Sequence, residues 1–160
     1  MLIFIIVWLL IIITCIKCVA SETKSIDEKI IEIVCEQVLE TPNEALLEPN
    51  LDLEGLTHIL EQLYANYFTP ESFKNFIQLR YGDQYHVVAS EMGKWITLKT
   101  LNITEDPQIP STYHFEAHVD IEDPLQAPIP VQVLGSATLE HHKITHIVFL
   151  DTALLEALTQ

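Results

Sequence analysis

The chain has 160 residues, of which 49% are hydrophobic, and its 8 Lys and Arg stand against 23 Asp and Glu, a formal net charge of −15. The apolar content is too high for a disordered chain, and the length suits one domain with a real core. The negative charge argues against nucleic acid as a partner and against binding to anionic lipid headgroups.

Residues 1–20 form an apolar run that only Thr14 and Lys17 interrupt. One interpretation is a secretory signal that is cleaved between Ala20 and Ser21; the other is a transmembrane anchor, since about 19 apolar residues nearly span a bilayer. The basic residues follow this run, which would favour a cytoplasmic domain, but acidic residues alternate with them and weaken that signal. We expect the membrane to be the partner of residues 1–20. The domain is then either extracytoplasmic at the cell membrane or secreted.

A single domain is predicted over residues 25–160, and it begins with a helix over 25–40. Ser25 and Glu28 have the spacing of a capping box, and apolar residues follow at helical intervals. Cys35 is the only cysteine of this domain, so it has no partner for an internal disulfide. A buried free thiol is therefore expected.

The strongest helical pattern lies within residues 56–77 and predicts two helices, over about 51–68 and 70–80. Apolar residues recur at steps of three and four. Thr69 is a preferred N-cap and Pro70 a preferred first helical residue, so the second helix is expected to start directly after Phe68. The two helices should meet at a sharp elbow.

Beyond Gly82 the pattern changes to the alternation of β-strands. A bulge near Lys99 and Thr100 would bring the two halves of one strand into phase, and Glu140 to His142 suit a hairpin turn. Helices followed by strands imply an α+β fold, with helices on one face of a curved antiparallel sheet of about five strands. The predicted strands cover about 84–90, 95–104, 112–122, 131–139 and 143–150, and a short helix covers 152–158.

Two segments carry a resemblance to a known superfamily: Tyr-Phe-Thr-Pro-Glu-Ser-Phe over 67–73, and Lys-Ile-Thr-His-Ile over 143–147. Within the order of elements over 50–150, the chain resembles the nuclear-transport-factor-two-like, or cystatin-like, proteins, in particular membrane-tethered or secreted members from Gram-positive bacteria. The resemblance implies a cone-like roll whose sheet wraps the helices around a pocket. Some members bind ligands or catalyse reactions there, whereas many act as interaction modules, and the fold by itself implies neither function.

One strand carries the pattern His114, Glu116, His118 and Asp120, which invites a metal interpretation. His114 and His118 lie about 13 Å apart on an extended strand, too far to share one ion, and no further ligand is nominated. The sequence therefore favours a solvated outer sheet face, with no metal and no cofactor.

No catalytic residue is nominated, because the sequence lacks a hydrolase nucleophile motif and a phosphate-binding loop. A ligand pocket in the cone would use polar side chains that point with the apolar ones, although such residues are more often plain core. The candidates are Tyr64, Tyr67, Tyr85, Tyr113 and His146, the last through its shared parity with Ile144 and Val148.

Two function classes follow. The favoured one is a non-enzymatic, membrane-tethered or secreted domain that acts in protein interaction or envelope assembly, through a protein partner or a homo-oligomer. The alternative is a small-molecule-binding or isomerase/cyclase-like enzyme that uses the cone pocket. The alternative requires at least two polar side chains that converge in an enclosed cavity.

Overall fold

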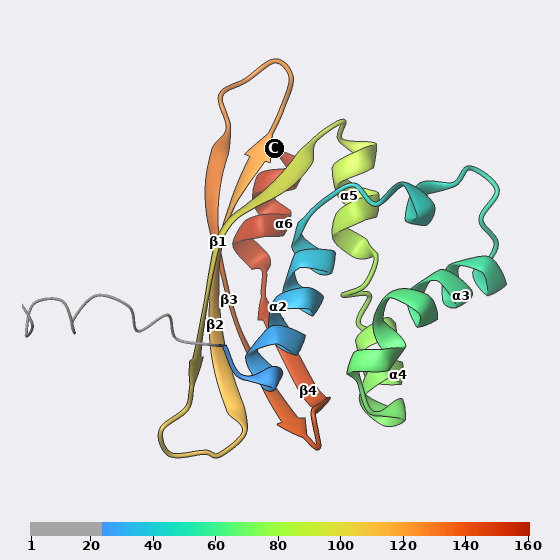
Figure 1. Ribbon diagram of the computed structural model, residues 1–160. Coiled ribbons are helices and arrows are strands. Elements are labelled where there is room, and N and C mark those ends of the chain that lie inside the picture. Colours follow the sequence, from blue (N-terminus) through green and yellow to red (C-terminus); the bar gives the residue numbers. More distant parts are fainter. Residues whose placement is uncertain (1–23) are drawn as a thin grey trace, which may run out of the picture.

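The computed structural model describes residues 24–160, so the predicted signal or anchor at 1–20 lies outside the described part (Figure 1). Helix α2 (Ile26–Leu39) begins with the predicted capping box: Ser25 Oγ accepts from the Glu28 N–H, and the Glu28 carboxylate accepts from the Ser25 N–H. Its buried face includes Cys35, which is a free thiol as expected. Within residues 24–160, no helix is both long and apolar enough to cross a bilayer.

The predicted elbow is confirmed. A short 3-10 helix, η1 (Glu44–Leu47), leads to α3 (Leu53–Tyr64), which continues as the 3-10 turn η2 (Ala65–Tyr67). Helix α4 (Pro70–Gln78) then starts at once, with Thr69 as its N-cap and Pro70 as its first residue. The Thr69 hydroxyl accepts a hydrogen bond from the Ser72 N–H at 3.4 Å.

The strand predicted over 84–90 is wrong: this segment is helix α5 (Gln84–Glu91). The alternation of Tyr85, Val87 and Ala89 resembles a strand, but Tyr85 and Ala89 are also four residues apart and share one buried helix face. This face packs against α2, β1 and the C-terminal helix α6 (Thr152–Thr159). Tertiary contacts therefore decide the conformation of a segment whose own pattern is ambiguous.

The sheet has four antiparallel strands rather than about five, in the order β1-β2-β3-β4. They are β1 (Trp95–Glu105), β2 (Thr112–Glu122), β3 (Ile129–Glu140) and β4 (Lys143–Leu150). The predicted bulge is confirmed, because the β1–β2 register shifts between Leu98 and Thr100. The predicted hairpin is confirmed too: Glu140 pairs with Lys143, and the two residues between them, His141 and His142, both have positive φ.

The helices of residues 24–160 lie on one side of the sheet (Figure 1). Helix α2 contacts β1 and α6 contacts β3, while α3 stands farther from the sheet. No element within residues 24–160 covers the opposite face. The sheet is not strongly curled around the helices, so the chain has the predicted α+β layers without the deep wrap of a cone.

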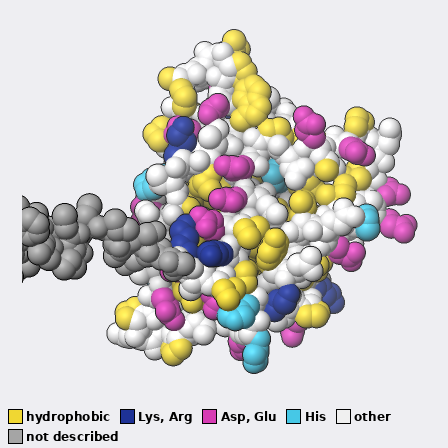
Figure 2. All heavy atoms as spheres, in the orientation of Figure 1, with side chains coloured by type: hydrophobic (Ala, Val, Ile, Leu, Met, Phe, Trp, Pro, Cys, Tyr) yellow, Lys and Arg dark blue, Asp and Glu magenta, His cyan; other side chains and the backbone are white. Residues whose placement is uncertain are grey.

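Strand β2 shows how the sheet separates its two faces. Tyr113, Phe115, Ala117, Val119 and Ile121 are buried under the helices, whereas their alternating neighbours are exposed or half-buried on the outer face. The predicted alternation of this strand is therefore confirmed. Acidic side chains are spread over the visible surface, where basic ones are few (Figure 2).

Candidate functional site

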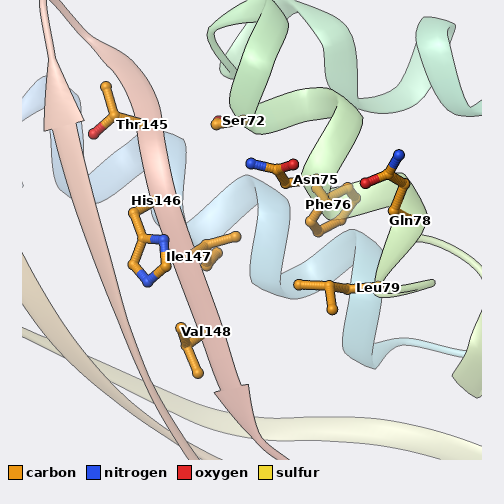
Figure 3. Close-up of a pocket in the computed structure, with 9 residues that line it drawn as sticks. All are labelled: Ser72, Asn75, Phe76, Gln78, Leu79, Thr145, His146, Ile147 and Val148. Atoms are coloured by element: carbon orange, nitrogen blue, oxygen red, sulfur yellow. The ribbon is translucent and has the colours of Figure 1, made fainter.

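A groove of about 270 Å³ runs between helix α4 and strand β4 (Figure 3). Phe76 and Ile147, both buried, form its apolar floor, and the exposed residues Asn75, Gln78 and Leu79 form the helix wall. The volume lies just under the range of about 300–1,000 Å³ that small-molecule pockets occupy. The groove is lined by Ser72, Asn75, Phe76, Gln78, Leu79, Thr145, His146, Ile147 and Val148.

Hydrogen bonds fix α4 beside β4 at one end of this groove. The carbonyl oxygen of Ile144 accepts from the Thr69 N–H at 3.0 Å and from the Ser72 hydroxyl at 2.5 Å. Phe68 forms an isolated parallel bridge with Ile144 at the same place. The N-cap of α4 therefore holds the helix against the strand.

Aromatic contacts fix the far end of the groove. The Tyr81 ring, in the turn after α4, lies with its centroid 5.1 Å from that of Phe149 and 6.0 Å from that of Phe76. With α4 held at both ends, the width of the groove between them is set by the fold rather than by the flexible side chains of its rim.

The prediction that His146 points with the apolar residues is wrong. The β3–β4 register steps from Thr138–His146 directly to Leu139–Ile144, so Thr145 is an extra residue in β4 and shifts the phase of the strand. Ile144 and Ile147 are buried, whereas His146 is exposed. His146 thus lies at the groove margin and not in the core.

β4 is the last strand of the sheet, and the outer face beside it is apolar. Leu134 is 43% exposed and Leu150 is 64% exposed, and these two residues are paired across β3 and β4. Val148, half-buried, faces the same way. We call Leu134, Val148 and Leu150 the outer apolar patch. Leu134 and Leu150 are thus neighbours rather than single scattered apolar residues.

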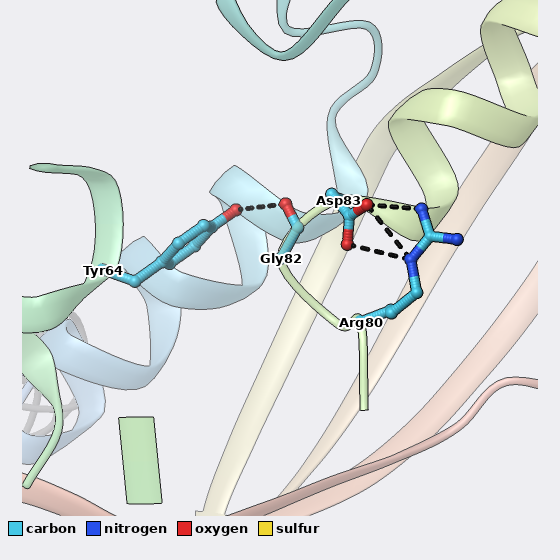
Figure 4. Close-up of polar contacts among 4 residues, drawn as sticks. All are labelled: Tyr64, Arg80, Gly82 and Asp83. Carbon is cyan, nitrogen blue, oxygen red and sulfur yellow. Dashed lines mark hydrogen bonds and ion pairs between the residues drawn. The ribbon is translucent and has the colours of Figure 1, made fainter. Parts of the chain in front are cut away.

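The candidate tyrosines do not converge on the groove. Tyr64, Tyr85 and Tyr113 are buried in the core, and Tyr67 is half-buried against it. The Tyr64 hydroxyl lies 3.1 Å from the carbonyl oxygen of Gln37 and 3.4 Å from that of Gly82, as part of the turn in Figure 4. This hydroxyl therefore has structural acceptors on two neighbouring segments.

The same turn contains an ion pair. Arg80 follows the C-cap of α4 and has a positive φ, and its guanidinium donates to the buried Asp83 carboxylate at 2.5 Å (Figure 4). The hydrogen bond to Asp83 raises the pKa of Arg80. An arginine folded back onto its own turn stabilises that turn and places a positive charge beside the buried Asp83 carboxylate.

Tyr85 donates a hydrogen bond to Asp151 Oδ2 at 2.5 Å, and Gln84 Nε2 donates to the same oxygen at 3.2 Å. Asp151 stands at the N-cap position of α6 but makes no side-chain cap there. Burial, followed by the bond to Asp151, raises the pKa of the Tyr85 hydroxyl, which stays protonated. The contact joins α5 to α6.

His86, which the sequence did not nominate, is fully buried. Its Nδ1 accepts from the Asn43 N–H at 3.0 Å, so the proton of the neutral ring lies on Nε2, which donates to the Gln37 carbonyl oxygen at 3.0 Å. Burial lowers the pKa of His86, while the bond to Gln37 and the charge of Asp83 oppose that effect. The neutral imidazole joins α2, the following loop and α5.

The free energy of unfolding should consequently decrease as the pH falls below 6.5, the ordinary pKa of histidine. Between the lowered folded pKa and 6.5, the unfolded chain binds a proton that the folded chain excludes, so the free energy of unfolding decreases as pH falls. Thermal melts at pH 7.5 and 5.5 should show a lower melting temperature at pH 5.5. In His86→Gln, which keeps an amide in place of the ring, this difference should shrink; an undiminished difference would assign the effect to other groups.

The outer-face histidines pair with carboxylates rather than with one another. His114 Nε2 lies 2.9 Å from Asp106, and Glu116 accepts from His118 and Gln132. The bond to His114 lowers the pKa of Asp106, and the bond to Gln132, then that to His118, lowers the pKa of Glu116. Among residues 24–160, no three His, Cys, Asp or Glu side chains are grouped so as to hold a metal ion.

The groove was missed because its walls are distant in sequence and its polar residues carry no motif. Asn75 and Gln78 look like ordinary solvent-facing helix residues, and only the placement of α4 beside the last strand gives them a common surface with Thr145. The one available signal was Thr69-Pro70, which fixes the helix start that packs on Ile144.

Comparison of the chain with protein-family models, with curated proteins and with solved structures finds no match in any of the three. A proposal for its function therefore has to be argued from the groove, from the outer apolar patch and from the charge of the chain.

Proposed function

We propose that this chain is a non-enzymatic protein-interaction domain, tethered to a membrane or secreted, that binds its partner through the α4–β4 groove and the adjoining outer apolar patch. In this proposal the domain lies outside the cytoplasm, on the strength of the apolar run at 1–20. Kinship with the cystatin-like superfamily, in which many members are interaction modules, belongs to the same proposal.

The observation that carries the proposal is the position of the groove beside the last strand of the sheet. An edge strand presents backbone N–H and C=O groups that a partner can pair with. Here it also borders the exposed leucines of the outer apolar patch, Leu134 and Leu150. Backbone pairing next to an uncharged apolar surface is a common arrangement for binding a polypeptide.

The geometry favours a protein partner over a small substrate. The candidate hydroxyls of Tyr64 and Tyr85 are engaged with structural acceptors, and the groove offers two exposed amides, Asn75 and Gln78, without a titratable acid or base apart from the exposed His146. Catalysis requires groups that can move protons or stabilise charge at a common point. The enzyme alternative would require ligand binding to bring such groups together at one point.

A photoreactive residue at Gln78, in the full chain expressed in its own host, tests the proposal. Gln78 is exposed and lines the groove, whereas Gln62 is exposed on α3 and provides the matched control. Irradiation should give a discrete crosslinked band from position 78 and none from position 62. Equal bands from both positions, or no band from correctly localised protein, would remove the groove as the binding site.

The location needs its own test. We expect a C-terminally tagged chain to be found in the membrane or secreted fraction, with its tag accessible to protease added outside intact cells. A tag that is protected in intact cells and cleaved only after lysis would place the domain in the cytoplasm and contradict this part of the proposal.

A further inference from the structure

We infer that the groove takes an extended segment of the partner, which adds as a strand to β4 and carries an apolar centre flanked by basic residues. This inference rests on the proposed function, since it specifies the chemistry of the partner at the same groove. Strand addition is the mode that an open edge beside a helix favours, because main-chain bonds supply affinity while the helix wall selects side chains.

The edge of β4 is occupied at only one end. Ile144 is engaged by Thr69, Ser72 and Phe68, whereas no backbone bond from outside the sheet reaches Thr145 to Val148 among the described residues. These four residues extend over about 13 Å and form the strand wall of the groove. That length suits a short extended segment better than a whole second sheet.

The side-chain surroundings define the centre of the segment. Phe76 and Ile147 provide an apolar floor, and Leu79, 57% exposed, extends this surface to solvent. An apolar side chain of the partner would cover these groups, while the amides of Asn75 and Gln78 are placed to bond its far backbone edge. An alternating polar and apolar strand fits both walls at once.

The charge of the chain favours basic residues on either side of the apolar centre of the bound segment. It also argues against a second copy of the chain as the occupant of the groove. The chain has a net charge of −15, so two copies repel each other, whereas a basic polypeptide is attracted. One carboxylate, that of the exposed Glu71, lies directly before Ser72 in the groove wall. Among the basic groups on the same elements, Arg80 is paired with Asp83, whereas Lys143 donates to the Asn66 carbonyl oxygen and Lys74 is exposed. The attraction for a basic segment therefore comes from the net charge of the chain.

The test uses the ¹⁵N-labelled full chain in detergent micelles and synthetic peptides with a Thr-Val-Thr-Val core. The peptide with Lys pairs at both ends should shift the amide signals of Thr145 to Val148 and of α4. The same peptide with Glu pairs should lose affinity by about tenfold or more. A peptide with Pro in the core should lose as much, because Pro lacks the N–H needed for strand pairing.

Two tryptophan variants on α4 provide the matched comparison. Asn75→Trp fills the groove and should weaken the Lys-flanked peptide by about tenfold. Lys74→Trp lies on the same helix outside the groove lining and should not weaken it. Circular dichroism melts verify that both variants remain folded.

The outcomes separate this inference from the proposed function. Equal binding to Asn75→Trp and the unaltered chain, or amide shifts that leave out Thr145 to Val148, would overturn strand addition and show that the peptide binds by charge attraction alone. If no peptide binds while Gln78 still crosslinks a partner in cells, the inference fails and the proposed function stands. If neither occurs, both fail.

Discussion

Replacing Gly135 with valine is expected to destabilise the domain by about 3 kcal/mol, near the upper end of the usual cost of overpacking a core. A Cβ at this position would lie 2.1 Å from Phe115 Cζ and 2.4 Å from the Val148 carbonyl oxygen. Phe115 and Phe149 pack across this point, with ring centroids 5.2 Å apart. Because the backbone oxygen cannot rotate away, the added side chain forces both the strand and the rings to move.

The measurement is the midpoint of chemical and thermal unfolding, where a loss of this size lowers the melting temperature by on the order of 10 °C. Ser136→Val is the control, because Ser136 is the next residue of β3 and is half-buried on the outer face. It should retain normal stability, since valine suits an outward strand position. Equal destabilisation by the two substitutions would show that Gly135 is not required for ring packing.

The features that the sequence predicted correctly are those with local causes. The capping box at Ser25, the elbow at Thr69 and the bulge at Lys99 each depend on a few adjacent residues. The alternation of β2 is equally local, because each side chain follows the pleat of its own strand. Such signals do not depend on knowing which elements are neighbours in space.

The features that were missed depend on distant contacts. Helix α5 forms where the sequence alternates like a strand, because its buried face, with His86 bonded to Asn43 and Gln37, packs among other helices. The direction of His146 depends on an extra residue that only the pairing of β3 with β4 reveals.

Predicting the groove from the sequence would require still more knowledge of which distant elements are neighbours in space. Its existence depends on β4 being the last strand and on α4 lying beside it, and neither follows from periodicity. A helix placed against a sheet edge covers part of that edge, which a sequence pattern within one element does not reveal. The groove is thus a consequence of topology and is formed by residues whose types are unremarkable.

Leu60→Asp is expected to unfold the domain. Leu60 is 2% exposed, and its Cδ2 lies 3.0 Å from where a Cβ on Gly82 would stand, next to Phe76. The substitution forfeits roughly 2 kcal/mol of apolar burial and places a carboxylate in the same space at a further cost of several kcal/mol. The sum is comparable to the ~5–15 kcal/mol that stabilises a typical domain.

Circular dichroism and the dispersion of amide signals would show the loss of the folded state. Gln62→Asp adds the same charge at an exposed position of the same helix and should stay folded, which separates burial from the rise in net negative charge. Leu60→Asn removes the charge but keeps the polar group, so it should lie between Leu60→Ala and Leu60→Asp in stability. A folded, soluble Leu60→Asp would mean that α3 can leave the sheet side of the domain without unfolding it, and that the α3–α4 elbow is not required for the core.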